Sequence, residues 1–146
     1  MPRADYWGIE QELAEILRAN VQGLTVEVEA EMQFGAELSP WAVVYLERRD
    51  APDGLQGISA GTRTHFRLRF SIWVWCCSLE KEAAIKQRDE TLAEVERVLM
   101  QNRTLNDTVD SSWLDGGELQ TGKTQESDFL SGGEVVLLAD IVSSVT

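Results

Sequence analysis

The chain has 146 residues, of which 43% are hydrophobic and 26% charged, values typical of a single globular domain. Its net charge of −12 excludes a protein that grips nucleic acid in a basic groove, because phosphate binding requires clustered lysines and arginines. No apolar run approaches the roughly 20 residues that span a bilayer, so we expect no membrane contact. The first residues show no secretory signal.

The first third of the chain predicts a helix followed by two strands. Residues 5–19 place apolar side chains at helical spacing, which indicates an amphipathic helix. Residues 24–32 alternate apolar and polar side chains, as in a half-buried strand whose solvent face carries Glu27, Glu29 and Glu31. Another strand is predicted at residues 41–49.

Residues 50–63 form a predicted loop with one proline and three glycines. Connections in compact domains are usually shorter, so this length indicates a functional arm.

The following strand, predicted at residues 64–77, is the most informative segment. Its core face alternates strictly from Phe66 to Cys76, as expected for a strand with one buried face. The opposite face begins with basic side chains and ends with two tryptophans: His65, Arg67, Arg69, Ser71, Trp73 and Trp75. A solvated face would not carry two neighbouring tryptophans, so we expect something to pack on it, either this chain or another subunit.

The last part of the chain predicts a second helix and two strands. Helical spacing runs over residues 80–100, and an irregular segment at about 103–133 includes a weak strand near 117–125. A strong apolar strand follows at 134–142. We therefore predict a single α+β domain over residues 1–146. It has a mainly antiparallel sheet of about five strands with two helices on one face, in the order α-β-β-β-α-β-β.

The segment Gly117–Thr124 matches the phosphate-binding loop pattern letter for letter. Such a loop must follow a buried strand and open a helix, so that backbone N–H groups converge on the anion. Neither flanking segment has that character, and Glu118 and Glu126 would repel phosphate. We therefore interpret it as a glycine-rich turn or short strand, with nucleotide binding as the alternative.

The single histidine and the two cysteines predict no metal or catalytic site. Cys76 and Cys77 are adjacent, so on a strand they point to opposite faces and cannot easily form a disulfide. His65 lies about 35–40 Å from them along the same strand. We expect buried free thiols, a surface histidine, no metal and no cofactor.

The acidic side chains Glu27, Glu29 and Glu31 allow three interpretations. Carboxylates at i and i+2 on a strand lie roughly 6.5–7 Å apart, a spacing compatible with acid/base catalysis or with a cation site. They could equally be a solvated strand face. The third interpretation is an acidic lining for a channel through which a polyanion slides.

Taken together, the layout resembles the tail terminator proteins of long-tailed bacteriophages. The resemblance covers residues 5–142. It is carried by the strand Phe66–Trp75, the helix Glu80–Met100, the sequence Val98–Leu105 at the end of that helix, Thr108-Val109 and the strand after Gly132-Gly133.

This resemblance implies a structural role in the virion, with assembly in the host cytoplasm. Such proteins form a hexameric ring at the head-proximal end of the tail tube, stop tube polymerisation and contact the head connector, while DNA crosses the central hole without specific binding. The family has no catalytic residues. Arg67, Arg69, Trp73 and Trp75 are then candidates for the subunit interface, and the three glutamates for the channel lining. Another head–tail morphogenesis protein, a tube subunit or head-completion protein, is the alternative.

Overall fold

The computed structural model describes residues 3–31, 38–51, 63–123 and 128–144. This part of the chain contains two helices, α1 (Tyr6–Asn20) and α3 (Lys81–Gln101). The strands, in chain order, are β1 (Thr25–Val28), β2 (Trp41–Asp50), β3 (Arg63–Ser78), β4 (Ser111–Leu114), β5 (Leu119–Lys123) and β6 (Phe129–Ser144). The predicted α+β class and element order are confirmed, with six strands in place of about five.

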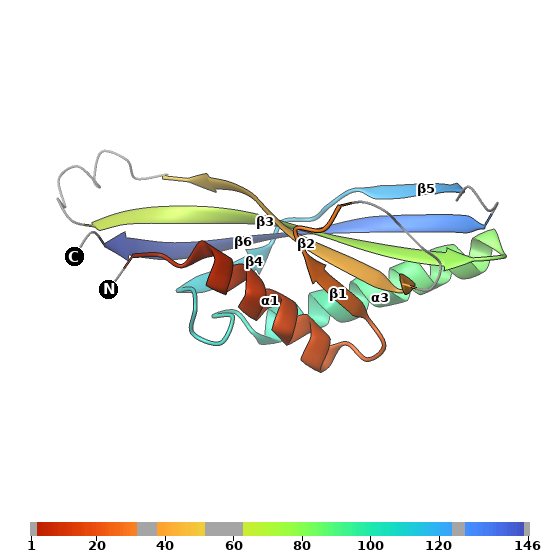
Figure 1. Ribbon diagram of the computed structural model, residues 1–146, viewed down its shortest axis with the longest axis horizontal. Coiled ribbons are helices and arrows are strands. Elements are labelled where there is room, and N and C mark those ends of the chain that lie inside the picture. The colour runs from red at the N-terminus through yellow and green to blue at the C-terminus, as the bar shows by residue number, and fades with distance from the viewer. Residues whose placement is uncertain (1–2, 32–37, 52–62, 124–127, 145–146) are drawn as a thin grey trace.

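The strands form one sheet in the order β1-β2-β3-β6-β4, and β5 also pairs with β6. All neighbours are antiparallel except β1 and β2, which are parallel. Strands β3 and β6 pair over their full length, from Arg63 opposite Ser144 to Ser78 opposite Phe129. At about 3.3 Å per residue, this pair is about 50 Å long and sets the long axis of the molecule (Figure 1).

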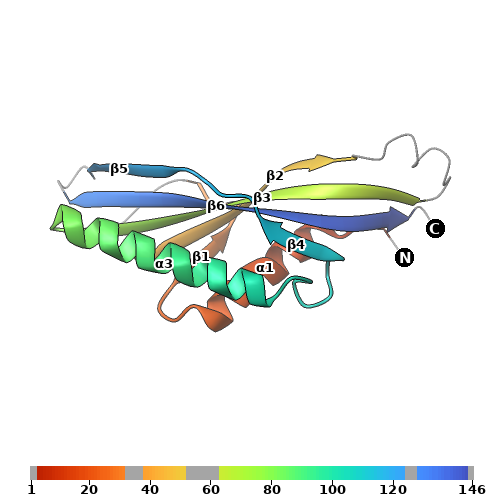
Figure 2. The ribbon, with the colours of Figure 1, turned by 180° about the vertical axis from the view of Figure 1, so that it is seen from behind.

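Both α1 and α3 lie on the same face of the sheet, and neither covers the opposite face (Figures 1 and 2). The core lies between these layers. The core-facing residues of β3 are fully buried, as their alternation predicts: Leu68, Phe70, Ile72, Val74 and Cys76. Helix α1 contributes Leu13 and Leu17, and α3 contributes Val95 and Leu99. Burying each such side chain stabilises the fold by about 1.5–3 kcal/mol.

The strand predicted over residues 24–32 is wrong in its second half. β1 ends at Val28, because Glu29 adopts a left-handed backbone conformation with φ of 53°. The direction of the chain changes there, so Val28 packs against the main core while Ala30 packs on the opposite face. The chain then returns to the same end of the sheet, which makes β1 and β2 parallel.

The segment predicted as irregular, 103–133, contains more regular structure than expected. The predicted weak strand is present as β5, and the sequence analysis missed β4 altogether. Gly116 and Gly117, both with positive φ, connect the two strands along the same edge of β6. Most of the predicted loop at 50–63 lies outside the described residues.

Candidate subunit interface on the uncovered sheet face

Alternate residues of β3 point away from the helices, and these include all four predicted interface residues: Arg67, Arg69, Trp73 and Trp75. The register places them beside specific neighbours on β6. Arg67 lies opposite Asp140, Trp73 opposite Glu134 and Trp75 opposite Gly132. The strand therefore brings the four side chains onto one face, as predicted, with the arginines toward one end and the tryptophans toward the other.

Arg67 is held by a carboxylate of its own chain. Its Nε and Nη2 atoms donate to the two carboxylate oxygens of Asp140 at 2.9 and 3.3 Å, and its guanidinium lies 4.9 Å from the centre of the Trp113 ring. His65 Nε2 also lies 3.3 Å from Asp140. Burial would raise the pKa of Asp140, but the hydrogen bonds from Arg67 and His65 outweigh it and lower that pKa.

Further cross-strand polar contacts extend this arrangement. Arg69 pairs with Glu47 at 3.1 Å and with Asp115 at 3.5 Å. Ser71 donates a hydrogen bond to Glu134 at 2.5 Å. We call Arg67, Arg69 and their carboxylate partners the charged ladder. Its two arginines are already paired with three carboxylates of the same chain, so it offers a neighbour a polar surface with no unpaired arginine.

The tryptophan end of this face is covered in part by the chain itself. Trp41, Val43 and Trp75 form a second buried cluster, against which Ala30 and Leu38 pack from the connection between β1 and β2. Trp75 is 8% exposed. Trp73 stacks on Trp75 with ring centres 5.4 Å apart and is only partly buried. Of the two predicted tryptophans, Trp73 is therefore the one that a neighbour can reach.

Gly132 makes room for the Trp75 ring. A Cβ atom at this position would lie 2.2 Å from a ring carbon of Trp75, closer than atoms can approach. The glycine therefore allows the indole to lie flat across β6.

The three glutamates predicted to line a channel do not share one strand face. Glu27 is in β1 and partly buried, whereas Glu31 lies beyond the strand and is exposed. Glu29, at the turn, accepts a hydrogen bond from the backbone N–H of Leu46 at 2.8 Å. The regular alternation in the sequence did not reveal this break.

Glu29 also lies beside a buried carboxyl group that the sequence analysis did not identify. Glu10, on the core-facing side of α1, is 5% exposed. Burial, together with the hydrogen bond and charge of Glu29, raises the pKa of Glu10 to about 8. The two carboxyl groups are therefore stable together when Glu10 holds a proton.

The segment that matches the phosphate-loop pattern is extended. Leu119–Lys123 pair with residues of β6, and all five side chains are exposed. Backbone N–H groups in a strand do not converge on an anion, so the described residues of this motif lack the geometry of a phosphate loop. Among the described residues, no group of three acidic, histidine or cysteine side chains is placed to hold a metal, and no helix is long and apolar enough to cross a membrane.

The sequence analysis did not identify the side chains that contact Arg67, Arg69 or Ser71 on this face: Asp140, Glu134, Glu47, Asp115 and Trp113. A signal existed for two of them, since Glu134 and Asp140 have the same parity in the predicted terminal strand. That parity could have suggested a carboxylate partner for Arg67. Trp113 gave no such signal, because β4 is only four residues long.

The sequence matches no protein-family model and no curated protein. Among solved structures, the chain is similar to the sheath/tube terminator of an extracellular contractile injection system (PVC), determined by cryo-electron microscopy in the extended state. The match has a TM-score of 0.50 and 14% identity, and it covers 100% of this chain and 61% of the terminator chain. The chain thus spans about three-fifths of that protein's length, and the match shows a shared fold over this part.

Proposed function

We propose that this protein is a tail terminator: a structural subunit that forms a hexameric ring on the head-proximal end of a phage tail tube. In this role it ends tube polymerisation, joins the tail to the head connector and has no catalytic activity. The observation that carries the proposal is the likeness of the whole chain to a protein described as a sheath/tube terminator. The sequence resemblance to phage tail terminators points the same way.

The uncovered sheet face supports assembly with further copies. A ring requires two different surfaces on each subunit, one for each neighbour. The charged ladder and Trp73 provide one broad surface, which neither α1 nor α3 covers. Arginine and tryptophan are enriched at protein interfaces.

The net charge of −12 suits a ring through which DNA passes. An acidic protein repels the phosphate backbone, so DNA would move through the hole without being held. Glu27 and Glu31 remain candidates for this lining. Glu29 is a weaker one, because its carboxylate already accepts a hydrogen bond from Leu46.

The proposal is tested by assembling tubes from the tail tube protein of the same particle with and without this protein. We expect the added protein to cap one end of each tube and to stop its growth, and negative-stain images to show a ring at that end. Particles that lack the protein should carry overlong tubes.

Two results would contradict this function. Tubes whose length and ends are unchanged by a large molar excess of the folded protein would show that it does not terminate them. Incorporation along the whole tube would instead identify a tube subunit.

A further inference from the structure

The two ends of the molecule carry features that complement each other. Among the described residues, the large apolar side chains most exposed to solvent are Leu79 at 81%, Leu119 at 60%, Trp7 at 59% and Met100 at 59%. Leu79 follows the last residue of β3, at one end of the long axis, whereas α1, which carries Trp7 in its first turn, begins on the side of the molecule toward the other end (Figure 1).

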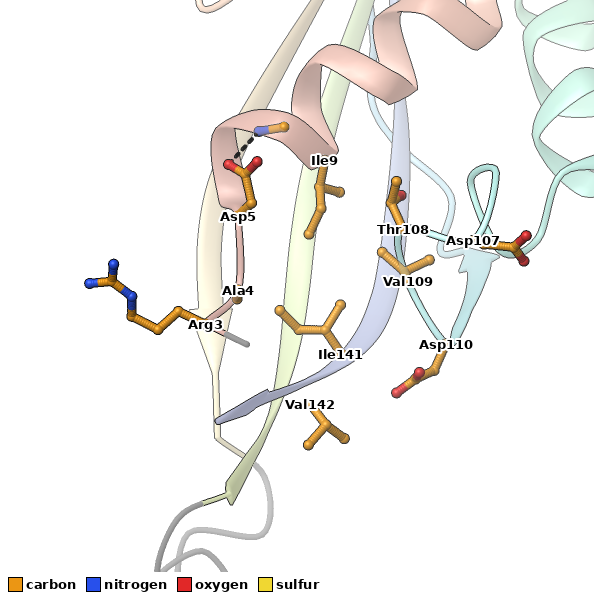
Figure 3. Close-up of a pocket in the computed structure, with 11 residues that line it drawn as sticks. Arg3, Ala4, Asp5, Ile9, Asp107, Thr108, Val109, Asp110, Ile141 and Val142 are labelled. Atoms are coloured by element: carbon orange, nitrogen blue, oxygen red, sulfur yellow. Dashed lines mark hydrogen bonds between the residues drawn. The ribbon is translucent and has the colours of Figure 1, made fainter. Parts of the chain in front are cut away.

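A pocket of about 310 Å³ lies beside Ile141 and Val142, near the end of the β3–β6 pair that is opposite Leu79. We call it the end pocket. It is bounded by the first turn of α1, the turn that precedes β4 and the last residues of β6 (Figure 3). Three buried apolar side chains line it, those of Ile9, Val109 and Ile141, while Val142 borders it with a side chain that points to the other face of β6 (Figure 3). Four charged residues also border it, and their side chains are exposed: Arg3, Asp5, Asp107 and Asp110.

The opposite end presents a matching projection. Leu79 is followed by Glu80 and Lys81, and all three side chains are exposed. We call these three residues the Leu79 tip. The pocket is apolar inside and its border carries one base and three acids, so it can take an apolar side chain that is followed by a base, with Lys81 available to pair with the aspartates and Glu80 with Arg3.

We infer that the end pocket receives the Leu79 tip of a second copy of this chain. The β3–β6 pair separates the tip from the pocket by about 40 Å, so a subunit cannot fill its own pocket. Contacts between two different surfaces join subunits head to tail, and such contacts close into a ring where the rotation between neighbours allows it. The inference rests on the proposed ring and names one of its joints.

Sedimentation velocity of the full chain over a concentration series tests the joint. Leu79→Asp places a charge in the apolar pocket, so we expect its dissociation constant for self-association to rise at least tenfold over wild type. Ala4→Phe fills the pocket from its edge and should weaken association by a similar factor. Leu119→Asp and Met100→Asp are the matched controls, because they alter equally large exposed side chains away from both ends, and they should associate as wild type does.

A mixing experiment is the decisive step. The Leu79→Asp protein keeps a working pocket, and the Ala4→Phe protein keeps a working tip. Each variant alone should associate at least tenfold more weakly than wild type, and an equimolar mixture should form a 1:1 dimer, since one competent joint remains between the two. Circular dichroism and thermal melting confirm that each variant folds. If Ala4→Phe unfolds the chain, Asp110→Lys is used as the pocket variant in its place. Asp110 is exposed beside the pocket, and a lysine there would repel Lys81 of the incoming tip.

The inference is overturned if wild type stays monomeric at every concentration, if Leu79→Asp assembles as well as wild type, or if the mixture forms no dimer. None of these results decides whether the protein terminates tubes, which the tube-assembly experiment tests separately. Conversely, a protein that joins end to end through Leu79 but never limits tube growth would retain the joint and refute the terminator function.

Discussion

At the scale of single residues, Glu10 makes the fold sensitive to pH. Its carboxyl group is buried beside Glu29, and its pKa is raised to about 8. In the unfolded chain the same group loses its proton near its ordinary pKa of 4.5. The folded protein therefore binds more protons than the unfolded chain between these values, and the free energy of unfolding falls as pH rises through this range.

Glu10→Gln should remove this dependence, because the amide has nearly the same shape and carries no proton to lose. We expect the variant to be more stable than wild type at pH 8.5 by at least about 1.4 kcal/mol, the equivalent of one pKa unit. The advantage should shrink toward pH 5. Urea denaturation at several pH values measures it, with the exposed Glu15→Gln as control. Parallel curves for wild type and Glu10→Gln would show that Glu10 does not titrate in this range.

Gly132 provides a second test at a single residue. Gly132→Ala forces a methyl group into the Trp75 ring, so we expect a loss of about 1–3 kcal/mol in the free energy of unfolding. Gly122→Ala is the matched control, because a Cβ atom there meets nothing within 4 Å. Thermal or chemical denaturation compares the two. Equal stability of the variants would mean that Trp75 does not lie against β6.

At the scale of elements, the pairing of β3 with β6 depends on polar contacts as well as on the core. Asp140→Asn removes the charge that holds Arg67 and His65, and should lower the free energy of unfolding at pH 7 by about 1–3 kcal/mol. Asp50→Asn, which removes a more exposed ion pair with Arg48, should cost less than about 1 kcal/mol.

The pH dependence of this effect has the opposite sign to that of Glu10. The lowered pKa of Asp140 means that its carboxylate stabilises the fold above the ordinary pKa of aspartate, and that this contribution is lost as pH falls through the folded-state pKa. The difference between wild type and Asp140→Asn should therefore shrink below about pH 4. If the stability difference between wild type and Asp140→Asn stays constant down to pH 2, the loss comes from altered packing and not from the charge of the carboxylate.

The elements that could be predicted are those with long, regular patterns. The alternation from Phe66 to Cys76 placed both faces of β3 correctly, because side-chain direction in a strand depends only on neighbouring residues. The break at Glu29 left no mark in the sequence, since the alternation continues through it. The pairing of Arg67 with Asp140 joins residues 73 positions apart, and it required the strand register, which local patterns do not contain.

At the scale of the whole molecule, the long β3–β6 pair carries the candidate interface on one face and connects the two ends. The charged ladder and Trp73 lie along the uncovered face, while the Leu79 tip and the end pocket lie at the extremities. A subunit of this shape can contact neighbours on several sides while its helices protect the core. A subunit that joins a ring needs different surfaces for its two neighbours, and the two ends and the broad face are such surfaces.

The central claim is that copies of this chain form a ring that closes the growing end of a tail tube. Electron microscopy of tubes assembled with increasing amounts of the purified protein tests it most directly. We predict one ring at a single end of each tube, with tubes becoming shorter as the protein is added. Tubes of unchanged length with bare ends, at a protein concentration well above that of tube ends, would contradict the claim.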